Sequence, residues 1–356
     1  MKRTILLTCM ILLLLGGCSQ GQRQLYGPVT ELITDDSGTL TGLVVETDGK
    51  ERGILLTEET LVASQVEGIS REDFLAGAYP EVIVSAPYDR LNETLTTADG
   101  RELKACATDF LILEEVRTGE AALPDGTAAE LWQGAFSDRY LLADGTELLS
   151  VRTPSGPDGV YVGGLASFDD LSPTAQAQIS AYYEAQGLLY DPAAQLERAY
   201  QAYRADPDSF DGFFLEQSIY PTASNDRVIY FCTTLTLPLD GHASTMRNLC
   251  AAFDRETGEF LDPWSLFTLP PEEAPEALLD AAQIPDSSDR QEMAAALPPE
   301  HLIFHSNHLE MTFPQGTLPG EELTHIVAVD YPDLEGILQP WAVPVSETST
   351  EISASS

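Results

Sequence analysis

Basic residues are scarce in this sequence of 356 residues. Eighteen Lys and Arg residues stand against 57 Asp and Glu residues, which gives a formal net charge of −39 at pH 7. Such a surface repels nucleic acid and anionic lipid headgroups, and its better electrostatic match is a basic protein or a cation. The same charge can also serve only to keep an exported protein soluble. Nucleic acid is therefore excluded as a partner. Attraction of a basic protein or a cation, and solubility of an exported protein, both remain open as the role of this charge.

The cysteines are too few and too scattered for a disulfide framework. After the first 18 residues only Cys106, Cys232 and Cys250 remain, which is an odd number, and no pair has C-x-x-C spacing. This pattern argues against thiol catalysis. Cys232 and Cys250 are symmetric about the turn near Gly241, so a hairpin would bring them opposite each other. They either form a disulfide or remain small buried apolar residues.

Apolar runs long enough to cross a membrane are also missing. The run over residues 5–15 is shorter than the roughly 20 helical residues that a bilayer core of about 30 Å requires. It follows Lys2 and Arg3 and ends in Leu15-Gly16-Gly17-Cys18, which resembles the lipobox of bacterial lipoproteins. We therefore expect residues 1–17 to be a lipoprotein signal peptide and Cys18 to become the acylated N-terminus. The alternative is an ordinary signal peptide followed by a chance cysteine.

Acylation of Cys18 would hold the protein on the outer face of the bacterial cytoplasmic membrane. Two or three acyl chains on one residue anchor more firmly than one, since each buried CH₂ contributes about 0.8 kcal/mol. Residues 18–25 are expected to form a lipidated tether. The lipid anchor, of the palmitate type, would then keep the body of the protein close to the bilayer.

Short strands separated by turn dipeptides follow over residues 26–118. The stretch "PVTELITDDSGTLTGLVVET" alternates apolar and polar residues around a turn. "SREDFLAG" predicts a short helix with Ser70 as its N-cap and Gly77 at its end. Three strands, a short helix and two or three further strands are the element order of a small OB-like β-barrel. Because basic residues are few, we expect this barrel to be structural or to face a protein.

Residues 119–345 predict an α+β domain with an antiparallel sheet and flanking helices. One helix has Ser172 as its N-cap, Pro173 at its first position and Gly187 as its stop. The helix in "YDPAAQLERAYQAYRAD" repeats this pattern, and its Tyr-rich stripe indicates core packing.

The rest of this domain contains two acidic helices and a closing group of strands. The helices are expected near residues 272–282 and 289–296. "HLIFHSNHLEMTF" predicts a hairpin, and "GILQPWAVPV" predicts the last strand of the sheet. The tail over residues 346–356 has almost nothing apolar to bury and is expected to be disordered.

Three stretches of the second domain carry a resemblance to a known family. They are "AAFDRETGEFLDPWSLF", the hairpin "LIFHSNHLEMTF" and the closing "WAVPV". With the two helices before them, they resemble the extracytoplasmic domain of RsiV-type anti-sigma factors, which also accompanies some peptidoglycan deacetylases. The best-known task of that domain is binding lysozyme, a strongly basic protein. The resemblance implies a binding or sensing role at the cell envelope, toward a basic protein such as lysozyme or a cell-wall glycan.

No stretch carries a complete catalytic pattern. The sequence has no G-x-S-x-G, no phosphate loop and no Gly-rich nucleotide fingerprint. Asp169-Asp170 and the pair His301 and His305 echo the metal motifs of the deacetylases. In a strand, however, side chains four residues apart are some 13 Å from each other, too far to bind one ion. We therefore expect a non-enzymatic protein without a cofactor, with an envelope scaffold and then a peptidoglycan-modifying enzyme as alternatives.

One group of residues offers ligands for a metal ion. His305, His308 and Glu310 surround the turn of the predicted hairpin, with His301 or His325 nearby, and imidazole and carboxylate are ligands of Zn²⁺. The alternative is that these residues bind no metal and are polar residues of the turn and of one face of the strand. We expect no resident metal and retain these three residues as the candidates for one.

Overall fold

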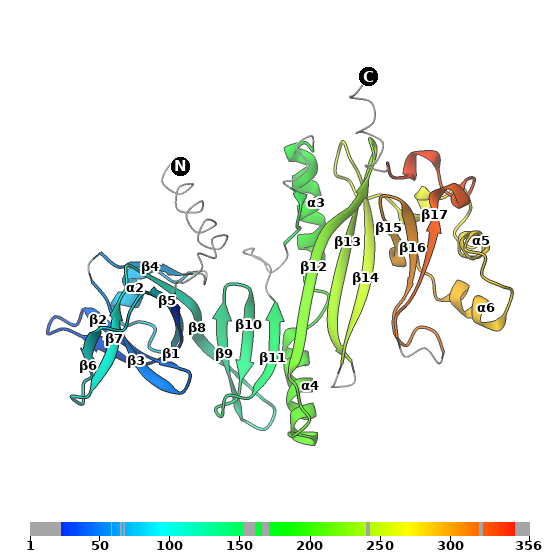
Figure 1. The fold of residues 1–356 in the computed structure, drawn as a ribbon. Coiled ribbons are helices and arrows are strands. Elements are labelled where there is room, and N and C mark those ends of the chain that lie inside the picture. Colours follow the sequence, from blue (N-terminus) through cyan, green and yellow to red (C-terminus); the bar gives the residue numbers. More distant parts are fainter. Residues whose placement is uncertain are drawn as a thin grey trace. The chain divides into compact units, whose positions relative to one another are not determined.

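The protein has an α+β fold that divides into two compact units. The computed structural model describes residues 23–345 except 58, 65, 67, 153–160, 166–170, 240–242 and 320–322. Cys18, the predicted signal peptide and the predicted tail therefore lie outside the described residues. The units are Met1–Gly119 with Leu131–Ala135, and Glu120–Glu130 with Phe136–Ser356 (Figure 1). Within the described residues, no helix has the length and apolar character needed to cross a membrane.

The first unit consists of two sheets that share one long strand. The first half of β1 (Arg23–Thr34) pairs with β5 (Val82–Tyr88), and its second half pairs with β2 (Leu40–Thr47). Gly27 lies where β1 changes partner, and a Cβ atom there would lie 1.9 Å from the carbonyl oxygen of Glu46. The other strands of the unit are β3 (Lys50–Leu55), β4 (Leu61–Ser64), β6 (Glu93–Thr96), β7 (Glu102–Ala107) and β8 (Phe110–Ala122).

The strand path of this unit is open, so the OB-like barrel expected from the sequence is not found among the described residues. From β1 the path runs through β2, β3 and β7 to β6 on one side, and through β5 and β8 to β4 on the other. A barrel closes only when the strands at the two ends of such a path pair with each other. Both end strands have only four residues, and each pairs with a single neighbour.

Local signals in the first unit agree with the structure, except at its beginning. The side chain of Ser70 caps α2 (Arg71–Leu75) by accepting a hydrogen bond from the backbone N–H of Asp73, and Gly77 follows the helix with φ +77°. Residues 23–25, predicted to belong to the tether, are instead part of β1. The reason is that Leu25 is buried in the core of the unit, together with residues of both sheets.

The second unit contains a sheet in which the strand order follows the sequence. Its strands are β10 (Ser137–Leu141), β11 (Glu147–Arg152), β12 (Phe213–Ser224), β13 (Val228–Leu239) and β14 (Ala243–Asp254), and β9 (Ala128–Gly134) has residues in both units. β11 and β12 run parallel, which corrects the prediction of an antiparallel sheet. The two helices between them return the chain to the same end of the sheet, and such a crossover makes the next strand parallel.

The helices of this crossover begin and end where the sequence predicts. Ser172 caps α3 (Pro173–Gln186), and Gly187 ends it with φ +65°. Asp191 caps α4 (Pro192–Ala205) by accepting hydrogen bonds from two backbone N–H groups. The apolar side of α4 packs in the core, as expected for its stripe, and the buried residues there are Leu196, Ala199 and Tyr200.

The last part of the second unit adds two helices and a small sheet next to β14 (Figure 1). The helices are α5 (Ala274–Ala281) and α6 (Ser288–Ala295), and the sheet contains β15 (Leu302–Phe304), β16 (His308–Phe313) and β17 (His325–Asp330). All strand pairs of this sheet are antiparallel. Tyr230 of β13 stacks on Phe304 of β15 with ring centroids 4.3 Å apart, within the core shared by the two sheets.

The final stretch of the domain is a turn and not the predicted strand. Pro340–Ala342 forms a 3-10 turn (η5), and Pro344 follows it. Proline has no backbone N–H and fits poorly in a strand that is paired on both edges. The side-chain amide of Asn225 holds this segment by donating to the carbonyl oxygens of Trp341 and Val343, each at 2.9 Å.

Candidate functional site

The hairpin formed by β15 and β16 brings two histidines together. His305 follows β15 and His308 begins β16, and the backbone N–H of His305 donates to the carbonyl oxygen of His308 at 2.9 Å. Only two residues therefore form the turn between them. The imidazole rings are stacked, with centroids 4.7 Å apart and an interplanar angle of 17°.

Glu310 lies beside the two rings because side chains two residues apart in a strand share a face. Its Oε1 is 3.0 Å from Nε2 of His308, and its Oε2 is 3.3 Å from Nε2 of His305. The ligand atoms of the three residues all lie within 4.8 Å of one another. The sequence-predicted candidates thus come together as one group, which we call the His305 cluster.

Two hydrogen bonds hold the backbone and one ring of the His305 cluster in place. Nδ1 of His308 lies 2.8 Å from Oδ1 of Asn307, in the turn. The hydroxyl of Tyr331 donates to the carbonyl oxygen of His305 at 2.6 Å. Burial raises the pKa of Tyr331 far above its ordinary value, so the hydroxyl keeps its proton and remains a donor.

Polar side chains of the large sheet lie within electrostatic reach of Glu310. Burial is the main cause that raises the pKa of Cys232 on β13 and of Tyr220 on β12, and the negative charge of Glu310 adds to both shifts. The hydroxyl of Tyr220 lies 3.1 Å from that of Thr234, whose hydroxyl donates to the side chain of Asn248. Polar side chains of the large sheet therefore contribute to the electrostatic surroundings of the cluster.

The two other histidines that the sequence placed nearby are not part of the cluster. His301 ends a 3-10 turn (η3, Pro299–His301) and is 4% exposed, and neither of its ring nitrogens has a hydrogen-bond partner in the described structure. His325 pairs with Phe313, at the far end of β16 from His308. Asp169-Asp170, the pair that resembles a metal motif of the deacetylases, lies outside the described residues.

Cys232 and Cys250 lie directly opposite each other on β13 and β14, as their positions around the turn predict. Both are free thiols. The backbone N–H of Arg255 donates to the carbonyl oxygen of Arg227, so these two residues form a hydrogen-bonded pair. Hydrogen-bonded and non-hydrogen-bonded pairs alternate along antiparallel strands, and the two cysteines therefore form a non-hydrogen-bonded pair, in which side chains are closest. Burial raises the pKa of Cys250 to about 12 and that of Cys106 to about 11, so these thiols are not activated as nucleophiles.

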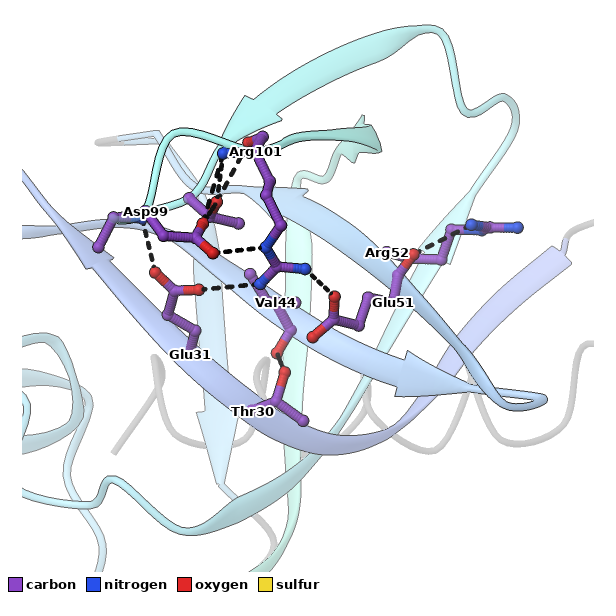
Figure 2. Close-up of polar contacts among 9 residues, drawn as sticks. Thr30, Glu31, Val44, Glu51, Arg52, Asp99 and Arg101 are labelled. Atoms are coloured by element: carbon purple, nitrogen blue, oxygen red, sulfur yellow. Dashed lines mark hydrogen bonds and ion pairs between the residues drawn. The ribbon is translucent and has the colours of Figure 1, made fainter.

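The first unit contains a different charged group, centred on Arg101 (Figure 2). The guanidinium contacts Asp99 at 2.8 Å, Glu51 at the start of β3, and Glu31 of β1 at 3.9 Å. The hydrogen bonds that the guanidinium donates to Glu51 and then to Asp99 raise the pKa of Arg101. Sequence reasoning missed this group because its carboxylates come from three separate segments. It joins β1, β3 and the turn between β6 and β7, and we call it the Arg101 cluster.

Among solved structures, two DUF3298 family proteins are distantly similar to this chain. No family model and no curated protein matches the chain. A DUF3298 family protein from Pseudomonas aeruginosa PAO1 is 17% identical, with 55% of this chain and 87% of that chain covered and a TM-score of 0.28. A DUF3298 family member from Bacteroides fragilis NCTC 9343 is 10% identical, with 64% and 92% covered and a TM-score of 0.33. Scores this low leave the function of the chain open.

Proposed function

We propose that this protein is a non-enzymatic lipoprotein on the outer face of the bacterial cytoplasmic membrane, anchored through Cys18, and that it binds a basic protein there. The observation that carries the proposal is the surplus of carboxylates, 57 against 18 basic residues. Lysozyme, the partner implied by the family resemblance, is the probe for this function.

The use of arginines inside the chain supports the proposal. Several arginines form ion pairs with nearby carboxylates, namely Arg117 with Glu81, Arg139 with Glu147, Arg152 with Glu216, Arg204 with Asp125, Arg290 with Glu276 and Asp280, and Arg101 within its cluster. Within these groups carboxylates balance the positive charges, and the net charge of −39 sets the field around the protein. A cationic partner would be attracted over roughly one Debye length, about 8 Å at physiological salt.

A salt-dependent binding assay tests this function. The protein without residues 1–18 is applied to immobilised lysozyme at low and at high salt, with a basic protein of unrelated fold, such as cytochrome c, as the control surface. We expect retention on lysozyme that falls with salt and exceeds retention on the control. Retention on neither surface would favour the envelope scaffold instead, and equal retention on both would show binding of basic proteins without a preference for lysozyme.

Two further assays address the anchor and the absence of catalysis. Mass spectrometry of the membrane-extracted protein is expected to find an acylated Cys18 as the first residue, and residues 1–17 still attached would contradict the anchor. Incubation with peptidoglycan and divalent metals is expected to release neither acetate nor reducing ends. The raised pKa values of the thiols support this expectation, because a protonated thiol is a poor nucleophile. Release of either product would favour a peptidoglycan-modifying enzyme.

A further inference from the structure

We propose that the His305 cluster is a binding site for a divalent transition-metal ion, with Zn²⁺ as the probe. This inference does not depend on the proposed partner. It rests on the placement of three metal-ligating side chains, His305, His308 and Glu310, around one point in the hairpin of β15 and β16.

The spacing of the ligand atoms matches the geometry of such an ion. Bonds of 2.0–2.1 Å to a tetrahedral Zn²⁺ put neighbouring ligand atoms about 3.3–3.5 Å apart. The two distances between imidazole nitrogens and carboxylate oxygens are 3.3 Å for His305 and 3.0 Å for His308. Both distances are close to this spacing, and the ligand atoms of all three residues lie within 4.8 Å of one another.

The balance of hydrogen-bond donors and acceptors in the cluster also favours a cation. Both ring nitrogens of His308 face oxygen atoms, Nδ1 that of Asn307 and Nε2 that of Glu310. A neutral imidazole has one N–H and cannot donate to both. A metal ion at Nε2 removes the conflict, because Nδ1–H then donates to the amide oxygen, as the second nitrogen of a metal-ligating histidine commonly does.

His305 gives an independent indication. Its Nε2 is buried and makes no hydrogen bond of acceptable geometry, although Glu310 Oε2 lies 3.3 Å away. A buried polar atom without a hydrogen bond costs about 1–3 kcal/mol, so native structures rarely leave one without a role. Coordination of an ion shared with Glu310 would satisfy this nitrogen.

The ligand set selects the class of metal and leaves room for one more ligand. Two imidazoles and a carboxylate suit Zn²⁺, Co²⁺, Ni²⁺ and Cu²⁺, whereas Mg²⁺ and Ca²⁺ prefer sites built from oxygen. Three protein ligands leave the fourth position of a tetrahedral ion for water or for a donor from a partner. Side-chain exposures of 32% for His305 and 23% for His308 and Glu310 place the cluster near the protein surface.

Metal titration of the untagged full-length protein in detergent, after removal of metals with a chelator, tests the site. Calorimetry with Zn²⁺ is expected to show one ion per chain, and Co²⁺ is expected to give the visible absorption of a tetrahedral site. Mg²⁺ and Ca²⁺ are expected to give neither signal. Absence of stoichiometric Zn²⁺ binding by the intact protein would overturn the proposal.

Variants separate the site from adventitious binding. Glu310→Gln and His308→Ala are each expected to weaken Zn²⁺ binding at least 10-fold, and to abolish the rise in melting temperature that Zn²⁺ causes in the unmodified protein. His325→Ala, on the same small sheet, is the matched control and is expected to bind as before. Binding that is equal in all variants would show an adventitious ion and overturn the proposal. The lysozyme assay is run with chelator, so each proposal can fail without the other.

Discussion

The Arg101 cluster of the first unit and the His305 cluster of the second both join nitrogen-rich side chains to carboxylates, but they differ in hydrogen-bond balance. Arg101 carries N–H donors on every side of its guanidinium and meets three carboxylates, which can only accept. Donors and acceptors match, and nothing further is needed. In the His305 cluster, two neutral imidazoles have two N–H groups for three oxygen atoms, two of Glu310 and one of Asn307, and a cation completes the set.

This difference shows that net charge alone does not identify a binding site in an acidic protein. Both clusters lie on strands or in the turns between them, and both contain exposed or half-exposed acids. The guanidinium of Arg101 is permanently charged and forms ion pairs with carboxylates of β1 and β3, so the Arg101 cluster links these strands to the turn between β6 and β7. The His305 cluster is built around a two-residue turn, and its two imidazoles and one carboxylate are suitable ligands for a metal ion.

Truncation in the core of the second unit should have the largest effect on stability. Phe253 is fully buried between α3 and the sheet, next to Tyr182, Tyr183 and Phe231. Phe253→Ala should lower the free energy of unfolding by about 3–5 kcal/mol, measured by urea titration with tryptophan fluorescence. Phe260→Ala is the control, because Phe260 stacks on Tyr182 but is 43% exposed, and it should cost about 1 kcal/mol. Equal losses would contradict the assignment of this core.

Glycine replacement tests the contact between α3 and the turn after β14. A Cβ atom at Gly258, where φ is +76°, would lie 2.3 Å from the carbonyl oxygen of Ala175. Gly258→Ala should therefore cost about 1–3 kcal/mol of unfolding free energy. Gly336→Ala has the same sign of φ but open space around its Cβ, so thermal melting should detect only the smaller backbone cost, about 1 kcal/mol. A smaller loss for Gly258→Ala would contradict the close approach.

His301 sharpens the comparison because it is a buried histidine whose ring nitrogens have no hydrogen-bond partner in the described structure. Burial, and then the charge of Arg247, lower the pKa of His301 below its ordinary 6.5. The unfolded chain therefore binds a proton more readily, and stability is complete above pH 6.5 and declines as the pH falls below it. His301→Met should remove this decline and raise the unfolding free energy by about 1 kcal/mol, measured by urea titration across pH. An unchanged pH profile would contradict this role.

Removal of the guanidinium from the Arg101 cluster should have the smallest effect. Hydrogen bonds from Thr97 and then Arg101 lower the pKa of Asp99, so this carboxylate stabilises the fold above its unfolded pKa and loses that contribution as the pH falls through its folded pKa. Arg101→Met should lower the melting temperature slightly at neutral pH and low salt, and the difference should vanish in acid or at high salt. Zn²⁺ binding should not change. A large loss at high salt would contradict a surface electrostatic role.

Helix ends and the hairpin were predictable because their signals are local. Ser70, Ser172 and Asp191 cap helices through backbone groups two or three residues away, and Gly187 ends α3 in the conformation that glycine favours. The same holds for the turn between His305 and His308. Such contacts depend on neighbours in the sequence, so the sequence is enough to predict them.

Pairing between distant strands was less predictable. The order of elements in the first unit fits a small barrel, yet its end strands β4 and β6 do not pair with each other. In the second unit, the parallel pairing of β11 with β12 follows from the path of the two helices between them. Which histidines meet was likewise decided by register, since His325 faces Phe313 and not the cluster. A shift of one residue in that pairing would turn the side chains to the opposite face.

The sequence by itself determined the acidic charge, the caps of the helices, the hairpin and the identity of three possible metal ligands. Only the tertiary structure decided that the strand path of the first unit stays open and that two rings and one carboxylate converge. It also decided that the ring nitrogens of His301 are buried without a hydrogen-bond partner among the described residues. The reason is physical: caps and tight turns are stabilised by groups a few residues apart, whereas strand pairing and burial depend on contacts between segments that the chain must first bring together.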